Sequence, residues 1–327
     1  MGIRELGLLD TQRAIKDCKD TFISSLAQEL NLSRVSAPLF VLQDSGFNDN
    51  LNGVERPVTF DIKESGKIAE VVHSLAKWKR FALKKYGFEM HKGLYTDMNA
   101  IRRDEIVDNI HSLYVDQWDW EKVISAEDRN LDFLKDVVRS IYKVIKSTCE
   151  SVREKYQLEK YDMPSEISFV TTQELEDNYP NLTPQERENA AAKKYGAVFI
   201  MQIGGLLKSG KKHDGRAPDY DDWSLNGDIF VDYPVIGRGL ELSSMGIRVD
   251  RASLLDQLAK ENAMDRLELP FHTALANGKL PLSIGGGIGQ SRLCMFMLGK
   301  RHIGEVQPSI WSDREIENCK KQGITLL

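Results

Sequence analysis

The feature that most constrains this chain is a glycine run near its C-terminal end, in the segment 284–292 (IGGGIGQSR). Four glycines in five positions leave almost no side chain, so a ligand can approach the backbone closely. A helix is expected to begin at Gln290, which places Arg292 in its first turn. Such a junction suits a nucleotide phosphate or a flat base. A tight connection between a strand and a helix explains the glycines equally well.

Composition excludes several classes of protein. The chain has 327 residues, of which 41% are apolar and 28% charged, so it is long enough to bury a large core. Its net charge of -5 disfavours a protein whose main task is to grip nucleic acid. No apolar run approaches the roughly 20 residues that span a bilayer. We therefore expect neither a nucleic-acid partner nor a membrane.

The cysteines and the first residues indicate the compartment. Cys18, Cys149, Cys294 and Cys319 lie far apart and form no C-x-x-C pair. This spacing favours reduced thiols over a zinc site or a disulfide framework. The segment 1–9 lacks the basic start and long apolar run of a secretion signal. A cytoplasmic location is therefore expected.

Apolar spacing predicts a mixture of helices and strands. Steps of three and four residues predict the longest helices over 10–30, 76–86, 125–156 and 290–298. The helix 76–86 is basic, and most of its lysines are expected on a solvated face. The extended segment 34–42 contains Pro38, which cannot donate a ladder hydrogen bond. We therefore expect this strand at a sheet edge or a subunit boundary.

A second candidate feature is the segment 111–121, which alternates well enough to form a strand. Alternation places Gln117 and Asp119 on one face and Trp118 and Trp120 on the other. An amide and a carboxylate two residues apart could hold the polar ends of an amino acid. An edge strand with one solvated face is the alternative interpretation.

Two acids lie on consecutive predicted strands. Asp228 precedes the strand 229–233, and Glu241 lies on the strand that follows a short turn. Strands joined in this way are antiparallel, so the two carboxylates are expected to face each other across the ladder. Oxygen ligands of this kind suit magnesium beside substrate phosphates. A pair of exposed acids is the alternative, and it is unfavourable without a cation between them.

The segment 205–212 nearly matches a P-loop but fails where the motif binds its ligand. Lys212 stands where serine or threonine would bind magnesium, and the residues that follow do not read as a helix. A P-loop phosphotransferase is therefore excluded. The acidic residues at 219–222 have the composition of a solvated turn.

Four strings carry a family resemblance: VHSLAKWKR (72–80), VDQWDW (115–120), RAPDYDDW (216–223) and ELSSMGIR (241–248). With Arg102 and the junction that ends at Arg292, the chain resembles the ammonia-dependent asparagine synthetases, or aspartate–ammonia ligases. This family shares three motifs with class II aminoacyl-tRNA synthetases. The likeness runs nearly from end to end.

The resemblance implies a fold and a reaction. The fold is α+β, a mainly antiparallel sheet flanked by helices, forming one catalytic domain over 1–327 with a helical insertion around 122–196. It also implies a homodimer that forms through the first helix and the Pro38 strand. The implied reaction joins L-aspartate and ammonia with ATP and Mg²⁺. The aspartate side chain attacks the α-phosphate to give β-aspartyl-AMP and pyrophosphate, and ammonia then displaces AMP.

The resemblance also implies the site residues. The implied ATP-binding residues are Arg102 at the α-phosphate, Arg292 at the nucleotide, Gly287 and Gly289 beneath it, and Asp228 and Glu241 as magnesium ligands. The implied residues for aspartate and ammonia are Asp49, Ser74, Lys79, Gln117, Asp119, Ser244 and Arg248. Among all of these, Asp49, Arg102, Gln117 and Arg292 are the expected catalytic residues. Asp49 is the expected partner of the substrate's α-ammonium group or of the incoming ammonium ion.

Other readings of the sequence remain open to test. An aspartyl- or asparaginyl-tRNA synthetase would need an anticodon-binding module, which is not expected before Asp10, and the acidic net charge of the chain also opposes this interpretation. An inactive amino-acid-binding paralogue would lack a motif arginine or a magnesium acid, and this chain has all of them. A glutamine-dependent synthetase needs a cysteine after the initiator methionine, where this chain has Gly2.

Overall fold

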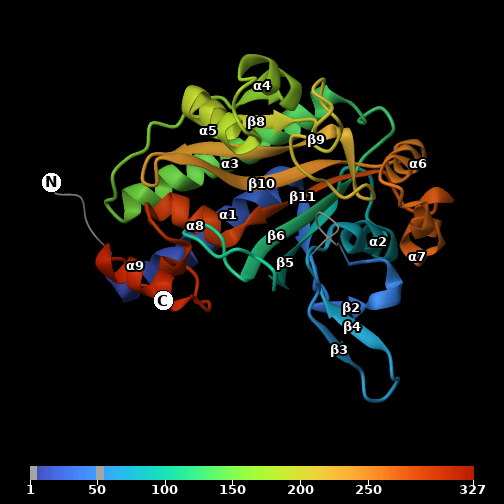
Figure 1. Ribbon diagram of the computed structural model, residues 1–327, viewed down its shortest axis with the longest axis horizontal. Helices are drawn as coiled ribbons and strands as arrows, with labels where there is room; N and C mark the ends of the chain where they lie inside the picture. The colour runs from blue at the N-terminus through green and yellow to red at the C-terminus, as the bar shows by residue number, and fades with distance from the viewer. Residues whose placement is uncertain (1–5, 49–54) are drawn as a thin grey trace.

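The computed structural model describes residues 6–48 and 55–327. An eight-stranded sheet with the order β1-β5-β6-β11-β10-β9-β8-β7 runs through the molecule (Figure 1). Its strands are β1 (Leu32–Arg34), β5 (Gly93–Ile101), β6 (Tyr114–Val123), β7 (Ser168–Thr171), β8 (Ala197–Met201), β9 (Asp221–Tyr233), β10 (Arg238–Arg248) and β11 (Ser283–Gly289). All neighbours are antiparallel except β1–β5 and β7–β8. The predicted α+β class with a mainly antiparallel sheet is confirmed.

One face of the sheet is covered by three helices, α1 (Leu8–Leu30), α3 (Leu131–Lys155) and α8 (Gln290–Leu298). Their apolar faces share one core with Trp118 and Trp120 of β6 and with Ile229 of β9. The alternation predicted for β6 is therefore confirmed. Fully burying one such apolar side chain contributes about 1.5–3 kcal/mol. This layer fixes the sheet and leaves the other face for chemistry.

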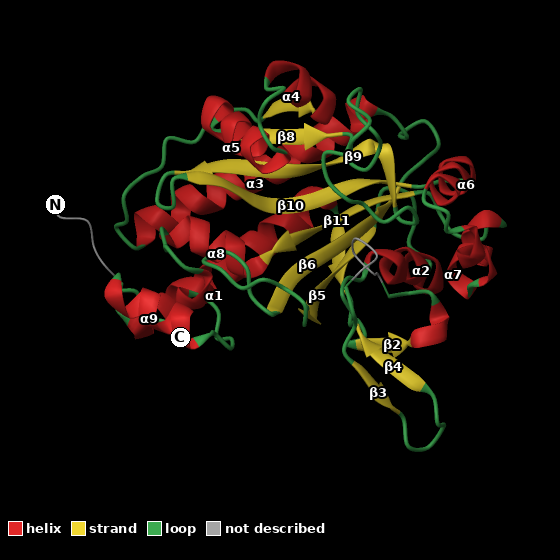
Figure 2. Cartoon of the chain, in the orientation of Figure 1, coloured by secondary structure: helices red, strands yellow, loops and turns green. Residues whose placement is uncertain are grey.

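The opposite face is only partly covered (Figure 2). Helix α2 (Ala76–Tyr86) packs on β6 and β11, and α5 (Pro184–Tyr195) packs on β8, β9 and β10. The remaining helical elements are α4 (Thr172–Asn178), α6 (Arg251–Lys260), α7 (Pro270–Ala276), α9 (Asp313–Lys321), η1 (Gln43–Ser45), η2 (Met264–Glu268) and η3 (Ile303–Glu305). A small sheet in the order β2 (Phe40–Leu42), β4 (Ile68–Val71), β3 (Thr59–Asp61) projects from the body (Figure 1).

The segment around Pro38 differs from its prediction. One continuous strand was expected over 34–42, but β1 and β2 belong to different sheets and Pro38 lies between them. Because proline has no backbone N–H for a ladder, the chain changes sheets at this residue. The expectation of an edge position is confirmed for β1, which is the outermost strand of the large sheet.

The start of the long helix also differs from its prediction. The helix expected over 125–156 begins at Leu131, where the Asn130 side chain accepts a hydrogen bond from the Phe133 N–H. Ser125 and Asp128 do exchange hydrogen bonds, but they close a turn before the helix.

The predicted helical insertion around 122–196 stays a prediction; α3 from this segment packs on α1, and β7 joins the large sheet. No helix in the described parts of the chain has the length and apolar character to cross a bilayer.

The glycine run is itself a strand. The interpretation of these glycines as a connection between a strand and a helix is wrong, because β11 continues to Gly289 and α8 begins at Gln290. Both edges of β11 are paired, with Gly287 opposite Ser244 of β10 and Asp119 of β6. Glycine is needed at 285 and 286 because neighbouring backbone and side chains occupy the space where a Cβ would stand.

Candidate active site

A pocket of about 450 Å³ opens on the sheet face opposite α1, α3 and α8. The structure brings most of the predicted site residues together along its wall. Those that line it are Ser74, Lys79, Arg102, Gln117, Asp119, Glu241, Ser244, Arg248, Gly287, Gly289 and Arg292. Asp228 does not line the pocket but pairs with Ser244 in the adjacent strand. Asp49 lies outside the described residues, so its predicted role stays a prediction.

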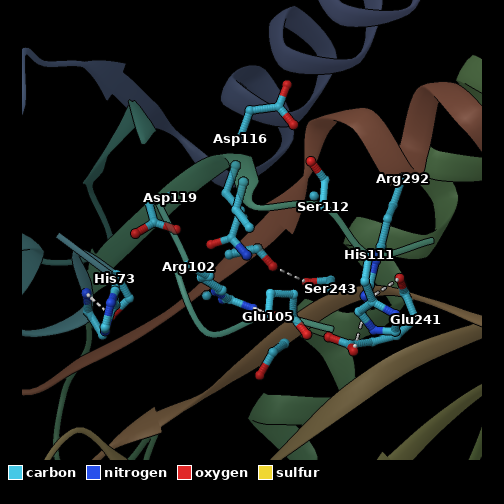
Figure 3. Close-up of a pocket in the computed structure, with 18 of the residues that line it drawn as sticks. His73, Arg102, Glu105, His111, Ser112, Asp116, Asp119, Glu241, Ser243 and Arg292 are labelled. Atoms are coloured by element: carbon cyan, nitrogen blue, oxygen red, sulfur yellow. Dashed lines mark hydrogen bonds and ion pairs between the residues drawn. The ribbon is translucent and has the colours of Figure 1, made fainter. Parts of the chain in front are cut away.

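The pocket has two ends with different chemistry. Figure 3 shows Asp119 and His73 at one end, and Arg292, Glu241 and His111 at the other, with Arg102 between them. We refer to the first as the amino-acid end and to the second as the nucleotide end. Strands β6, β11 and β10 run between the two ends, so one sheet face positions both.

Arg248 is the central charge of the amino-acid end. Its Nε donates to Glu121 Oε1 at 3.0 Å and its Nη2 to Glu121 Oε2 at 2.8 Å, while its Nη1 donates to Asp221. Burial raises the pKa of Glu121, but the guanidinium of Arg248 outweighs it and the pKa lies below its usual value. A guanidinium has five N–H groups, so one on each Nη is left for a substrate carboxylate.

Sequence reasoning missed Glu121 and Asp221. Glu121 continues the alternation of Gln117 and Asp119 on the pocket face of β6, and that alternation could have identified it. Asp221 was expected in a solvated turn, but it begins β9 and is only 2% exposed. The expected turn is present at Asp219, but the expected solvation is wrong for both acids, because each has a buried basic partner, Arg248 for Asp221 and Lys77 for Asp219.

Lys79 reaches the same end from α2. Its Nζ lies 2.8 Å from the Gly286 carbonyl oxygen and 3.5 Å from Asp119 Oδ2. Burial lowers the pKa of this amine, which is 1% exposed. The prediction of a solvated basic face is wrong for Lys77, Lys79 and Arg80, because α2 lies against the sheet and their side chains find buried acceptors.

Gly287 sets the floor beside these groups. An added Cβ at this position would lie 2.7 Å from Gln117 Oε1 and 2.9 Å from Asp119 Oδ1. Real side chains do not approach so closely, so only glycine lets both polar groups face the pocket. The corresponding Cβ at Gly289 would meet only the Arg292 side chain, at 3.5 Å. The two glycines therefore differ in how strictly they are required.

At the nucleotide end, the two arginines Arg292 and Arg102 contact different partners. Arg292 Nη1 lies 3.2 Å from Glu241 Oε2, and its Nε lies 3.4 Å from the Ile110 carbonyl oxygen. Arg102 Nη1 lies 4.0 Å from Glu105 Oε2, and its buried Nε has no hydrogen-bond partner among the described residues. Burial alone would raise the pKa of Glu241. The positive charges of Arg292 and of other nearby arginines have the larger combined effect, so the pKa lies below its usual value.

Asp228 and Glu241 are neighbours but do not face each other directly. Asp228 pairs with Ser244, whereas Glu241 pairs with Phe230, because a bulge lies between Glu241 and Ser243. The predicted direct pairing is therefore wrong, although both acids lie on the pocket side. Arg216 donates to both oxygens of Asp228. Burial, reinforced by Glu241 and opposed by Arg216, raises the pKa of Asp228. Two hard oxygen donors beside a cation fit magnesium.

A second group with potential metal ligands lies near the C-terminal helix. His302, Glu315 and Cys319 place one ligand atom each within 4.8 Å of the others. The Gly304 N–H donates to His302 Nδ1 at 2.9 Å, so the proton of the neutral ring is on Nε2. This nitrogen faces Glu315 at 3.2 Å and has no free lone pair for a metal. The group is therefore a close polar contact between His302 and α9.

Comparison with known proteins agrees with this geometry. A family model described as aspartate–ammonia ligase matches residues 9–323. A protein of Fusobacterium nucleatum named aspartate–ammonia ligase is 63% identical over 325 residues, which are 99% of this chain and 99% of that protein. A protein of Pediococcus pentosaceus with the same name is 58% identical over 324 residues, 99% of this chain and 97% of that protein.

Solved structures show the same fold at low identity. Asparaginyl-tRNA synthetase from Pyrococcus horikoshii, complexed with asparaginyl-adenylate, superposes with a TM-score of 0.67 at 17% identity, over 91% of this chain and 68% of that one. The Entamoeba histolytica enzyme gives 0.65 at 14% identity, over 93% and 68%. This likeness confirms the class II synthetase-like core. From the family model and the full-length relatives, the chain belongs to the aspartate–ammonia ligase family.

Proposed function

We propose that the protein makes L-asparagine from L-aspartate and ammonia, consuming ATP and releasing AMP and pyrophosphate. The observation that carries the proposal is one pocket with two unlike ends, in a chain whose full-length relatives are named aspartate–ammonia ligase. One end offers a fixed frame for a small carboxylate, and the other offers arginines for a polyanion. A ligase of this kind must hold both substrates in contact.

The first step activates a carboxylate, which is a poor acyl donor. Arg248 and Lys79 orient aspartate, with Gln117, Asp119 and Ser244 as further polar contacts, while Ser74 closes the site beside α2. An oxygen of the side-chain carboxylate attacks the α-phosphorus, and pyrophosphate leaves with the electrons of the broken P–O bond. Arg102 neutralises the charge that develops on the α-phosphate, and preset charge of this kind is often the largest catalytic contribution.

Arg292 and the metal site serve the nucleotide. The Arg292 guanidinium stacks on the base or contacts a phosphate, and Gly287 and Gly289 let the nucleotide lie against β11. Asp228 and Glu241 are the residues that would hold Mg²⁺, which supplies positive charge to the phosphate oxygens. Support comes from the donor set itself: two carboxylates on one sheet face, of which Glu241 lines the pocket and Asp228 is paired with Arg216.

The second step needs free ammonia as the nucleophile. Its nitrogen attacks the acyl carbon of β-aspartyl-AMP, and AMP leaves with the C–O bonding electrons. A carboxylate near the acyl carbon would attract ammonium and accept its proton. Asp49 is the residue that we assign to this task. Gln117 is the nearest described amide that could orient the reacting groups.

We also propose a cytoplasmic homodimer that forms through α1 and the segment around Pro38. Support comes from β1, one edge of which pairs with no strand among residues 6–48 and 55–327, and from Leu39 and Phe40, which are about half exposed beside Pro38. Sedimentation of purified protein at several concentrations tests this assembly. A monomer at micromolar concentration would contradict it.

The activity is tested by product analysis of purified protein with aspartate, ATP and magnesium. Parallel reactions contain ammonium, glutamine or no nitrogen source. We expect asparagine, AMP and pyrophosphate together only with ammonium. Formation of ADP instead of AMP would contradict adenylation. ATP–pyrophosphate exchange without asparagine would show correct activation and a wrong acceptor, and the same reaction with tRNA would then identify it.

A further inference from the structure

Arg216 is a cation that the reaction described above does not use. It lies on the loop between β8 and β9 and lines the pocket. Its Nη2 donates to both oxygens of Asp228, and its Nη1 lies 3.7 Å from Asp214 Oδ2. Both Arg216 and Asp228 are nearly buried. This ion pair therefore occupies the oxygen atoms that a metal ion would need.

The surrounding charges explain why a cation stands there. Asp228 and Glu241 lie two ladder positions apart on the same sheet face, and each acts electrostatically on Arg216. Two neighbouring carboxylates removed from water repel each other unless a cation lies between them. Arg216 supplies that charge when no metal does. A metal and the guanidinium cannot both use the two oxygens of Asp228.

The loop around Arg216 has a fixed point close to the arginine. Three residues farther on, buried Asp219 accepts from His272 Nε2 at 2.8 Å, Arg266 Nη1 at 2.9 Å and Lys77 Nζ at 3.2 Å. These bonds anchor the loop. The Nε of Arg216 is buried and makes no hydrogen bond with the described residues. The side chain can therefore exchange partners without moving the anchor.

We propose that Arg216 is an exchangeable counter-cation of the metal site. It neutralises Asp228 and Glu241 while the site holds no metal, gives these acids up when Mg²⁺ arrives with ATP, and then contacts the β- and γ-phosphates. Arg216 is thus a positioning residue before binding and a phosphate ligand afterwards. This inference rests on the proposed function, because it assumes that Asp228 and Glu241 receive the metal.

The first test uses metal alone, without nucleotide or aspartate. Mn²⁺ is titrated into wild type, Arg216→Gln, Arg216→Lys and Lys208→Gln, with calorimetry or the spin-resonance signal of free Mn²⁺ as the readout. We expect Arg216→Gln to bind Mn²⁺ at least about tenfold more tightly, because the intramolecular competitor is gone. Arg216→Lys is expected to resemble wild type.

Two controls locate this effect. Lys208→Gln removes one positive charge from the same loop, where Lys208 pairs with exposed Asp177, and it is expected to leave Mn²⁺ affinity unchanged. Adding Asp228→Asn to Arg216→Gln is expected to abolish the tightening. Unchanged or weaker Mn²⁺ binding by Arg216→Gln would overturn the proposal, because it would show that the arginine only supports Asp228.

The second test compares nucleotides in the presence of Mg²⁺. We expect Arg216→Gln to weaken ATP binding by about 10- to 100-fold and to leave AMP binding unchanged, since the lost hydrogen bonds are to the two outer phosphates. Equal weakening for ATP and AMP would overturn the phosphate assignment. Asparagine formation by wild type is measured separately, so failure of the proposed function is distinguishable from failure of this inference.

Discussion

The two ends of the pocket hold their charges in different ways. At the amino-acid end, Lys79, Glu121 and Arg248 are almost completely buried, and each has fixed partners within the sheet and α2. At the nucleotide end, the Arg292 and Glu241 side chains are 22% and 36% exposed and share one contact of 3.2 Å. From this difference we infer that a rigid set of buried charges holds the small substrate, whereas binding of a large polyanion requires charged side chains that can change partners.

The free-energy cost of breaking a buried charge pair explains this difference between the two ends of the pocket. A buried charge network is stable only while every member stays paired, so it can rearrange only where an incoming charge replaces the partner that leaves. Partly exposed ion pairs contribute little to stability and can be broken at little cost. The comparison predicts that substitutions at the first end unfold the protein, while those at the second end mainly impair catalysis.

The largest expected effect on stability is at Glu121. The variant Glu121→Gln removes the carboxylate that holds Arg248, and breaking such a buried pair costs about 3–5 kcal/mol of unfolding free energy. Urea denaturation measures it. Glu317→Gln, which breaks an exposed pair with Lys321, is the matched control and is expected to change nothing measurable. Equal losses in both variants would contradict the rigid-frame interpretation.

At the nucleotide end the expected loss is catalytic. Arg292→Gln is expected to lower kcat/KM for ATP by about 100- to 1000-fold, since one preorganised charge is removed from the reacting phosphates. The unfolding free energy should change little because the pair with Glu241 is partly exposed. ATP–pyrophosphate exchange and denaturation together measure both quantities. A large stability loss with normal exchange would reverse the proposed difference between the ends.

A substitution at Gly287 tests how tightly the floor of the pocket is packed between the two ends. Gly287→Ala places a methyl group against Gln117 and Asp119, so these side chains must move away from aspartate, and we expect kcat/KM for aspartate to fall about tenfold, or about 1.4 kcal/mol of activation free energy. Gly289→Ala, whose Cβ makes an ordinary contact, is the control. Similar aspartate kinetics in the two variants would show that the floor of the pocket is not tight.

The smallest expected effect is a pH dependence from Lys79. Burial lowers the pKa of Lys79 below that of an ordinary lysine, so the folded protein releases this proton at a lower pH than the unfolded chain does. Between the two pKa values the unfolded state binds more protons, and stability therefore rises with pH. Aspartate binding should fall over the same range, because the neutral amine no longer attracts a carboxylate.

Parallel measurements of stability and of kcat/KM for aspartate, from neutral to alkaline pH, check these opposite trends. Titration of tyrosines or other lysines complicates the stability curve, so Lys79→Met is the reference for both. A fall in kcat/KM at the same pH in this variant would show that another group titrates.

Local patterns predicted much of the fold. The bounds of α2 and α8 agree with their sequence periodicity, because a helix depends on neighbours three and four residues away. The path at Pro38 did not follow from local pattern, since it depends on which sheet each half can join. The glycine run was also misjudged, because pairing on both edges of β11 involves strands far away in the chain.

The sequence predicted which residues belong to the site, but not which of them pair with one another. Residues on one alternating face, such as Gln117 and Asp119, were identified correctly as neighbours. Glu121, Asp221 and Arg216 gained their importance only through partners distant in sequence. A charge whose partner is unknown resembles any solvated charge, so composition alone could not separate Lys79 from the exposed lysines of α2.

The position of β11 also has a consequence for the order of folding. This strand is the only link by strand pairing, among the described residues, between the β1-β5-β6 side of the sheet and the β10-β9-β8-β7 side. It is synthesised after both, so an emerging chain holds two incomplete sheets with open edges until residues 283–289 arrive. Substrate cannot bind across the sheet before β11 has joined its two sides. Ligands that bind across β11 therefore favour the joined state by mass action, and they act as a check that assembly is complete.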